Sequence, residues 1–517
     1  MSNFSKTAKN GIYGFIGQLI LYLFKFIDRR VFLQFLNVEL LGYRSLFGDI
    51  FSLLSLAELG IGSIIVYNLY KEFANHNESN INKLMSIYRY IYSIIGISVM
   101  GLGVVFSFFI KELTHTTSYD WTFLYIVYYL MLFSTVSSYF LSYRSTLYIV
   151  SQKEYKLIEI NVLVNSVFSI IKIVLLIITK NFIIYLVIDI LYNIVYNLVI
   201  FNMSSKDFTF LDDKYRVTVH DLREMNVFKD VRNILCSKIG STVFFSTDSA
   251  LISRLFGVSQ VALYANYTLI YGIARGATIG KMISAINPTV GNIVHSNRSN
   301  DDICNLFFKI DFLFNLLGVY FSVVFYVLCN VFISLWLGNQ YIFSEFFLFL
   351  YSIYVYLSNT FEATNTFRAP FGEFEYDRNY FLYSAIFNIV LSIVFAKMFG
   401  IIGILLGTIV AYLCICYGRI KFVFNKVLHI KIKDYCKLHF VEFIEFLAIV
   451  LIIRVMYDYF KIPNIYIIVK LLIAFCVTSL MFIVRYRGTQ IVKDLLDYLK
   501  IIGIPKGISN MLQKWLT

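Results

Sequence analysis

Long apolar stretches separated by short charged segments run through almost the whole chain. A helix needs about 20 mostly apolar residues to cross a bilayer. By that rule we identify about fourteen candidate spans. They are 11–32, 43–67, 89–110, 122–149, 158–179, 182–202, 234–256, 261–287, 306–336, 341–364, 379–398, 400–420, 441–460 and 464–484. The pattern predicts an all-α polytopic membrane protein, with charged residues crowding the junction of the first two spans between Lys25 and Glu39.

The loops between these spans differ strongly in positive charge. If the N-terminus is inside, about thirty Lys and Arg residues fall in inside segments and about eight in outside turns. The positive-inside rule therefore predicts a cell-membrane protein with both termini cytoplasmic. The outside turns are short, for example 257–260 and 338–340, which excludes a large extracellular domain.

The composition agrees with a lipid solvent. Hydrophobic residues make up 59% of the 517 residues and charged residues 15%, against roughly 25% charged in a soluble domain. The net charge of +13 lies between the apolar stretches, so we assign it to topology and anionic lipid headgroups and not to nucleic acid. The first helix lacks a small-residue cleavage pattern and is expected to stay in the mature protein.

The remaining composition gives no sign of a metal or cofactor. The seven cysteines are scattered without a CxxC pair and are interpreted as small buried hydrophobic residues. The six histidines are interpreted as lying between apolar stretches without metal-ligand spacing, and they receive no site role. The tail 485–517 has helical spacing of apolar and charged residues, which fits either an amphipathic helix on the inner leaflet or a helix packed under the bundle.

The chain can be divided by an internal similarity. A shift of 220 residues sets Asp28 against Asp248, Val38 against Val258 and Gly60 against Gly280. Two six-helix lobes with the same orientation are therefore predicted, and such parallel repeats recur in transporters with the substrate path between the halves. The resulting divisions are an N-terminal lobe (1–202), a cytoplasmic linker (203–233), a C-terminal lobe (234–420), two extra spans (441–484) and the cytoplasmic tail (485–517).

Ionisable residues inside spans are costly and by default face a cavity or a partner. The functional interpretation is a cationic path for an anionic substrate, with four carboxylates as ion-coupling or ion-pair candidates. The cations are Lys25, Arg29, Arg44, Lys172, Arg254 and Arg275, and the carboxylates are Asp28, Glu58, Asp248 and Asp311.

A structural interpretation stands beside the functional one. Arg144, Arg254 and Lys281 could extend to the lipid headgroups. Asp28 with Arg29, or Asp248 with Arg275, could be ion pairs that only hold helices together.

No enzyme signature is present, because the nearest string to a nucleotide-binding loop, 276–281, has the wrong spacing. Transport would then be driven by the substrate gradient, an ion gradient or the membrane potential, with Asp248 and Asp311 as coupling candidates.

Two regions carry a family resemblance. The first is RVFLQFLNVELLGYRSLF (30–47), which continues into LLSLAELGIG (53–62) and NLYK (68–71). The second is STDSALIS (246–253), followed by ALYANY (262–267) and VGN (290–292). Together they resemble the Wzx-type O-antigen and capsule repeat-unit flippases of the multidrug/oligosaccharidyl-lipid/polysaccharide exporter superfamily. The resemblance covers spans 1–2 and 7–8 closely and the other spans mainly by topology.

The resemblance implies two six-helix lobes around a polar cavity that opens alternately to the two leaflets. The implied substrate is undecaprenyl-diphosphate carrying an oligosaccharide repeat unit, with membrane lipids, a polysaccharide polymerase and glycosyltransferases as possible partners. The sequence departs from the family at Tyr43 and Arg44, where a small and an uncharged residue are usual, so Arg44 could be specific to one substrate.

Two other functions compete. A drug or cation antiporter of the same fold would have a cavity dominated by carboxylates and aromatic residues, which the cations of spans 1, 2, 7 and 8 disfavour. A membrane-embedded polymerase or glycosyltransferase would need a large outside loop or a soluble domain, which the short outside turns disfavour.

Overall fold

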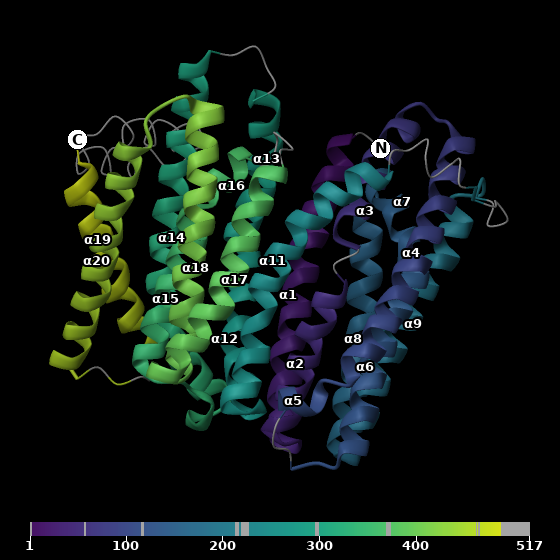
Figure 1. The fold of residues 1–517 in the computed structure, drawn as a ribbon, viewed down its shortest axis with the longest axis horizontal. Coiled ribbons are helices and arrows are strands. Elements are labelled where there is room, and N and C mark those ends of the chain that lie inside the picture. Colours follow the sequence, from purple (N-terminus) through teal and green to yellow (C-terminus); the bar gives the residue numbers. More distant parts are fainter. Residues whose placement is uncertain are drawn as a thin grey trace. The chain divides into compact units, whose positions relative to one another are not determined.

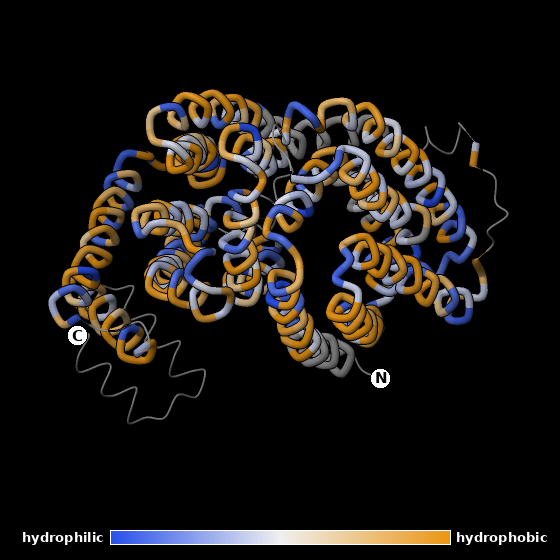
Figure 2. Tube along the Cα trace, turned by 90° about the horizontal axis from the view of Figure 1, so that it is seen from below, coloured by the Kyte–Doolittle hydropathy of each residue, from blue (hydrophilic) through white to orange (hydrophobic). Residues whose placement is uncertain are grey.

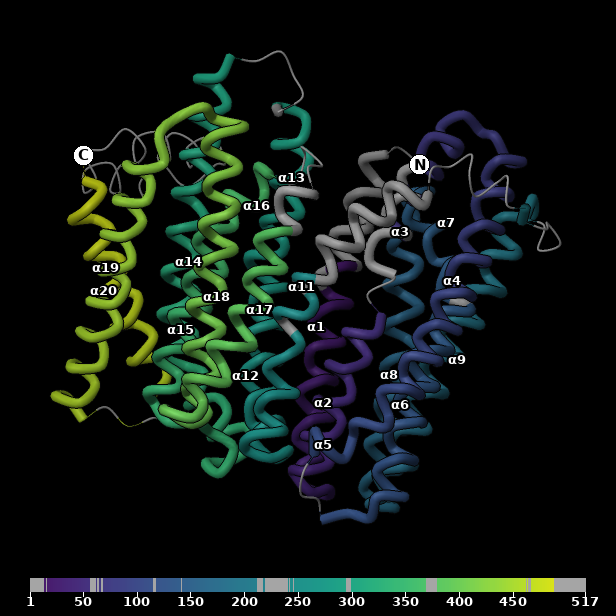
Figure 3. Tube along the Cα trace, viewed as in Figure 1, coloured from purple at the N-terminus to yellow at the C-terminus, as the bar shows by residue number. Residues whose placement is uncertain are grey.

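The fold is helical throughout the part of the chain that the computed structural model describes (Figure 1). That part comprises residues 3–55, 58–114, 118–211, 217–218, 227–294, 299–368, 374–461, 463 and 466–487, and the other residues are grey in Figure 3. Eight of the described helices are long and apolar enough to cross a bilayer. Hydrophobic residues, orange in Figure 2, make up most of the helical trace. The chain is thus an all-α, multi-pass membrane protein.

The chain forms two compact units. The first contains residues 1–266 and 374–407, and the second contains 267–373 and 408–517. The lobes predicted from the sequence, 1–202 and 234–420, follow the order of the spans and stay a prediction.

The first unit holds the N-terminal helices and the pair α11 and α17. Its helices are α1 (Asn3–Phe35), α2 (Val38–Leu54), α3 (Glu58–Ala74), α4 (Glu78–Ser107), α5 (Ile110–Thr114), α6 (Trp121–Leu141), η2 (Ser142–Arg144), α7 (Ser145–Val150), α8 (Glu154–Thr179), α9 (Phe182–Asp207), α11 (Val227–Phe256), α17 (Phe374–Phe399) and the first parts of α12 (Val258–Ala277) and α18 (Ile401–Phe422).

The second unit is centred on the long helix α14. Besides the remainder of α12 and α18, its helices are α13 (Ile279–Val294), α14 (Asn300–Trp336), η3 (Asn339–Tyr341), α15 (Glu345–Thr360), α16 (Glu362–Arg368), the π-helical turn η5 (Val423–Leu428), α19 (Ile432–Tyr459) and α20 (Ile467–Tyr486). Within this unit α14 packs against α15, α16, α19 and α20.

Four predicted spans are broken helices and not continuous ones. Span 43–67 is divided into α2 and α3, span 122–149 into α6 and α7, span 261–287 into α12 and α13, and span 341–364 into α15 and α16. Hydroxyl groups near the breaks donate to backbone carbonyls three or four residues earlier, as Ser55 does to Phe51 and Thr278 to Ala274. Such bonds compete with the helical ladder and bend a helix, and the apolar pattern does not reveal them.

The helix boundaries repeat with the predicted shift of 220 residues. The clearest case is α8 (Glu154–Thr179) and α17 (Phe374–Phe399), whose two ends coincide after the shift. The start of α2 at Val38 and that of α12 at Val258 also coincide, as do the ends of α3 and α13. This recurrence is the pattern that two six-helix repeats would give.

In the first unit α1 packs against α8, α8 against α9, and α11 against both α2 and α17. One close approach requires glycine, because a Cβ atom at Gly42 of α2 would overlap the backbone carbonyl of Val258. Phe32 of α1 is fully buried and makes edge-on ring contacts with Phe182 and Tyr185 of α9. The predicted tail beyond residue 487 and residues 212–216 and 219–226 of the linker lie outside the described residues.

Candidate functional site

Four helices of the first unit bring charged side chains together. Asp28 comes from α1, Arg44 from α2, Lys172 from α8, and Tyr185 and Asp189 from α9. We call these five residues the N-terminal charge cluster.

The hairpin of α8 and α9 explains how Lys172 and Asp189 meet. Lys180 ends α8 in the left-handed conformation. Asn181 precedes α9, and its side-chain oxygen accepts hydrogen bonds from the backbone amides of Ile183 and Ile184. Lys172 lies eight residues before this turn and Asp189 eight after it, so antiparallel helices place them at the same depth. Lys172 faces inward, whereas Leu163 and Ile178 belong to the exposed apolar face of α8.

The charges of the cluster are paired at short distances. The Lys172 ammonium lies 2.9 Å from Asp189 Oδ1 and 3.3 Å from Asp28 Oδ2. The Arg44 guanidinium lies 2.9 Å from Asp189 Oδ2 and 3.8 Å from Asp28 Oδ2. The two cations therefore share the two carboxylates, which makes this part of the cluster neutral.

Tyr185 joins the two sides of the cluster. Its hydroxyl accepts a hydrogen bond from Arg44 at 2.6 Å and donates one to Asp28 at 2.6 Å. Its ring also lies 4.9 Å from the Arg44 guanidinium and 4.6 Å from the Lys172 ammonium, within cation–π range. The hydroxyl and the ring together fix where both cations lie.

The cluster is not fully closed. The Arg44 side chain keeps 30% of its surface exposed and Asp189 26%, whereas Lys172 keeps 10%. Asp28 Oδ1 is buried without a hydrogen-bond partner among the described residues. A buried acceptor without a partner is unfavourable unless water or a ligand donates to it.

Arg29 adds a positive charge beside this cluster. Its guanidinium donates to the side-chain carbonyl of Asn266 at 3.0 Å, and Asn266 is fully buried. No described carboxylate forms an ion pair with Arg29, so the region contains three cations and two carboxylates. Lys25, one turn earlier on α1, is exposed with its ammonium 5.9 Å from the Tyr22 ring.

The predicted pair of Asp28 with Arg29 is thus wrong. Asp28 pairs with Arg44 and Lys172, because successive residues of a helix point in different directions and Arg29 is directed to α12.

The residues 220 positions later form a counterpart in which uncharged side chains donate to the acid. Asp248 of α11 accepts a hydrogen bond from the Tyr264 hydroxyl at 3.2 Å and from the Asn388 amide at 3.3 Å. The Ser392 hydroxyl donates to the Asn388 carbonyl at 3.0 Å. Tyr264 and Ser392 occupy the positions that correspond to Arg44 and Lys172. Asp248 is 4% exposed.

The predicted cations of the second half are arranged differently. Arg275 lies 2.8 Å from Glu362 of α16 and donates to the Asn359 side-chain carbonyl at 3.0 Å, so the predicted pair of Arg275 with Asp248 is wrong. A guanidinium between an acid and an amide is neutralised locally. Arg254 is exposed in the last turn of α11, which agrees with the interpretation that its side chain extends to the lipid headgroups.

Other sequence-based interpretations also change. Arg144 does not extend to headgroups, since it is 1% exposed and donates to the hydroxyls of Ser204 and Ser205. Glu58 begins α3, and its side chain lies outside the described residues.

The histidine interpretation needs correction at one position. His439 does not lie between apolar stretches, because α19 begins at Ile432, earlier than the predicted span 441–460, and His439 is buried within it. The imidazole lies 3.0 Å from the predicted coupling residue Asp311.

Tyr185 and Asn266 were not predicted as site residues, and Asp189 was identified from the sequence only as an ionisable residue near mid-span, without a site role. Tyr185 and Asn266 are uncharged, so their type gave no signal among 40 tyrosines and many polar residues. Asp189 could have been assigned to the site as the partner of Lys172, because both lie equally far from the short turn between α8 and α9.

No known protein family and no curated protein matches the sequence. Solved structures match the fold. The lipid II flippase MurJ, in an inward closed conformation, is 15% identical with a TM-score of 0.65, over 92% of this chain and 98% of that chain. An inward-facing multidrug resistance MATE family transporter of the MOP superfamily is 14% identical with a TM-score of 0.58, over 78% of this chain and 94% of that chain. This chain has the fold of the MOP superfamily.

A third structure with the MOP fold differs in its binding site. A MOP superfamily transporter from Pyrococcus furiosus is 15% identical with a TM-score of 0.55, over 81% of this chain and 96% of that chain. It is described as having a binding pocket of reverse polarity that suggests a different function. Since the MOP fold hosts more than one function, the function of this chain must be argued from its own residues.

Proposed function

We propose that this chain is a Wzx-type flippase. It translocates undecaprenyl-diphosphate-linked oligosaccharide repeat units across the cytoplasmic membrane for cell-surface polysaccharide synthesis, by alternating access through a cationic cavity. Both termini face the cytoplasm in this proposal. The observation that supports it is the surplus of positive charge around the N-terminal charge cluster, where Arg29 has no carboxylate partner among the described residues.

The chemistry of a lipid diphosphate suits these residues. A diphosphate offers several anionic oxygens, and Arg binds such groups with two parallel N–H donors. Arg29 has a neutral amide as its described partner, and Arg44 is partly exposed. A diphosphate that approached them would gain charge-assisted hydrogen bonds in an apolar surrounding, where such bonds are stronger than in water. The lipid tail would stay in the bilayer.

The cluster also explains why positive charge can persist inside apolar helices. Arg44 and Lys172 are held in place by Asp28 and Asp189, so they need no substrate to be stable. Arg29 is the cation whose charge is not balanced within the described residues. In the proposal Arg29 and Arg44 therefore contact the diphosphate, while Lys172 holds the two carboxylates. Lys25, Arg254 and Arg275 remain weaker candidates, and Asp248 and Asp311 remain candidates for ion coupling.

An antiporter for drugs or cations is the second candidate, because MATE transporters share the fold. The buried oxygen of Asp28 without a partner would be its natural cation ligand. The surplus of cations around Asp28 opposes that function, since it repels a positively charged drug.

A binding experiment separates the two functions. The purified protein in lipid nanodiscs is titrated with undecaprenyl diphosphate, with undecaprenol as the same tail without phosphate. We expect Arg29→Gln to weaken binding of the diphosphate about tenfold or more, as loss of a charge-assisted hydrogen bond of about 1.5–3 kcal/mol implies. Binding of undecaprenol should not change.

Arg454→Gln is the matched control. Arg454 is a cation of α19 whose side chain is half exposed and which faces Asp458 at 3.8 Å. The Arg454→Gln variant should bind undecaprenyl diphosphate with the affinity of the unchanged protein. Equal affinity for the diphosphate and for undecaprenol would contradict the proposal. Binding of an organic cation that is lost in Asp28→Asn would instead favour the antiporter.

A further inference from the structure

A histidine lies between two carboxylates in the interior of the second unit. His439 of α19 places Nε2 3.0 Å from Asp311 Oδ2 of α14 and Nδ1 3.0 Å from Glu442 Oε2. The three side chains are only 3–5% exposed. They lie on helices that pack directly against each other.

Each carboxylate is also held by a tyrosine. The Tyr435 hydroxyl donates to Asp311 Oδ1 at 2.8 Å, and the Tyr486 hydroxyl of α20 donates to Glu442 Oε1 at 2.5 Å. One oxygen of each carboxylate is therefore used by a phenol and the other faces the imidazole. Three helices, α14, α19 and α20, meet through these five side chains.

The two short distances favour a protonated ring. A neutral imidazole has one N–H donor and one lone pair, so one of its nitrogens would place a lone pair 3.0 Å from a carboxylate oxygen. The imidazolium has a proton on each nitrogen and attracts both acids. The contact of Nδ1 with Glu442 is close but not aligned for a hydrogen bond, so it is the weaker of the two.

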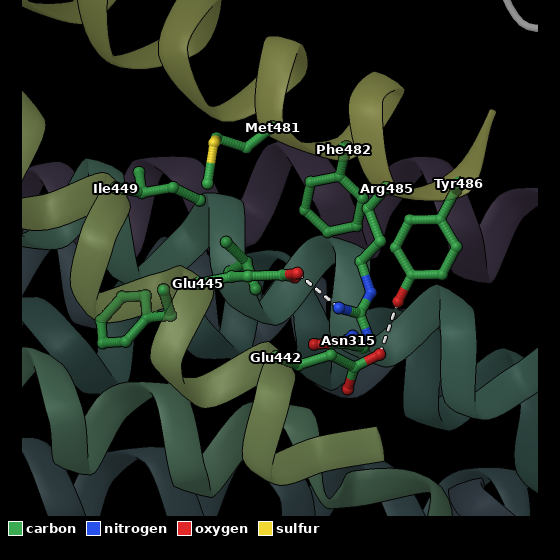
Figure 4. A pocket seen from close by; sticks show the side chains of 10 residues that line it. Asn315, Glu442, Glu445, Ile449, Met481, Phe482, Arg485 and Tyr486 are labelled. Atoms are coloured by element: carbon green, nitrogen blue, oxygen red, sulfur yellow. Dashed lines mark hydrogen bonds and ion pairs between the residues drawn. The ribbon is translucent and has the colours of Figure 1, made fainter. Parts of the chain in front are cut away.

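A small cavity adjoins the triad, and Figure 4 shows Glu442 on its wall near Asn315, Arg485 and Tyr486. Asn315 is 2% exposed and its carbonyl oxygen has no hydrogen-bond partner among the described residues. On the same wall Arg485 is bound to Glu445. The cavity thus presents a buried acceptor, Asn315, beside Glu442, whose Oε2 has no aligned donor among the described residues.

The net charge of this region is negative. Asp311, Glu442 and Glu445 are opposed by Arg485 and by His439 only when the ring is protonated. Among the described residues, these groups also interact with Tyr435 of α19, Tyr486 of α20, Tyr356 of α15 and Cys416 of α18, and an ordinary phenol or thiol carries no charge at neutral pH. Removal of the His439 proton would leave the carboxylates without their shared positive partner in an apolar interior, which is strongly unfavourable.

We propose that His439, Asp311 and Glu442 form a proton-binding site that fastens α19 to α14. A proton from bulk water converts His439 to the imidazolium, which bridges the acid of α14 and the acid of α19. Release of the proton to bulk water removes the bridge and weakens the contact of α19 with α14. The site is separate from the N-terminal charge cluster and does not depend on the identity of the substrate.

The proton itself can be observed. Solid-state nitrogen NMR of protein with labelled histidines in liposomes distinguishes imidazolium from neutral imidazole, and the difference from His439→Gln assigns the signal. We expect both ring nitrogens of His439 to be protonated at pH 7.5, where an ordinary histidine with a pKa near 6.5 is mostly neutral. A neutral His439 ring at that pH would overturn the proposal.

The fastening is tested by thermal unfolding between pH 5 and pH 10. A proton held more tightly in the folded than in the unfolded protein stabilises fully below about pH 6.5 and stops stabilising as the pH rises through the deprotonation of the folded state. We expect the unchanged protein to lose stability as the pH rises through this deprotonation. In Glu442→Gln the loss should occur at a pH at least about one unit lower, because one carboxylate no longer attracts the imidazolium.

Two variants complete that test. His439→Gln cannot bind the proton and should lack this loss. Glu445→Gln, which changes a neighbouring acid bound to Arg485, should leave the pH of the loss unchanged. A profile of His439→Gln identical to that of the unchanged protein, or an equal displacement by Glu445→Gln and Glu442→Gln, would overturn the proposal.

Discussion

The two acids that correspond across the 220-residue shift lie in very different surroundings. Asp28 of α1 is bound by Arg44 and Lys172, whereas Asp248 of α11 is bound by Tyr264 and Asn388. The helices that follow them, α2 and α12, begin at corresponding positions, and the acid is present both times. The partners named here differ, being cationic at Asp28 and uncharged at Asp248.

The difference shows which part is scaffold and which part is specialised. At Asp248 two uncharged side chains, Tyr264 and Asn388, donate to the buried acid, whereas Asp28 faces two cations. Two extra cations in an apolar bundle, and a third in Arg29, are costly unless they serve a ligand. We therefore propose that the anionic substrate of the flippase binds to the first half.

The largest effect is expected for Lys172→Met, which tests whether the ion pairs of Lys172 with Asp28 and Asp189 stabilise the folded protein. The change leaves two acids with Arg44 as their remaining cation and should lower the free energy of unfolding by about 3 kcal/mol, in the range for a broken buried ion pair. Thermal unfolding in detergent measures the loss. The control is Ser392→Ala at the corresponding position, which should cost far less, and equal losses would contradict the comparison.

The next largest effect is expected for Arg44→Tyr, which gives position 44 the residue type of the corresponding position in the second half, Tyr264. Because Tyr carries no positive charge, binding of undecaprenyl diphosphate should weaken about tenfold or more. A titration in nanodiscs measures the change. Unaltered affinity in a folded Arg44→Tyr protein would show that the difference between the two halves has no role in binding.

A smaller effect is expected for Tyr185→Phe. The ring remains under both cations, but the hydroxyl between Arg44 and Asp28 is lost, which should cost about 1–2 kcal/mol of stability. Thermal unfolding measures it. A variant as stable as the unchanged protein would mean that water replaces the hydroxyl fully.

The smallest effect is expected for Tyr264→Phe, which removes the 3.2 Å hydrogen bond to Asp248. About 1 kcal/mol of stability should be lost, with no change in the affinity for undecaprenyl diphosphate. A loss of affinity similar to that of Arg44→Tyr would place substrate binding on both halves.

Much of the fold could be predicted from the sequence, because lipid imposes long apolar helices whose ends are marked by charge. The shift that aligned Asp28 with Asp248 also aligns the ends of α8 and α17. The helix breaks were missed, since they depend on hydroxyls that bond to the preceding turn, as at Ser55 and Thr278.

The site could be predicted only in part. Arg29, Arg44, Lys172 and Asp28 were found because charge inside an apolar stretch is rare, and the structure brings them together. Their pairing could not be predicted, because it depends on which faces of α1 and α2 point toward α9. The same limit hid His439, whose helix begins before the apolar pattern does.

The central claim is that the positive charge of the first half carries a lipid diphosphate across the membrane. The most direct measurement is translocation of a fluorescent undecaprenyl-diphosphate-linked oligosaccharide in proteoliposomes, detected by quenching from outside. We expect transport by the unchanged protein and by Tyr264→Phe, and loss of about nine-tenths or more of the rate in Arg29→Gln and Arg44→Tyr, as a tenfold weaker interaction implies. Transport by these two variants at the unchanged rate would contradict the account.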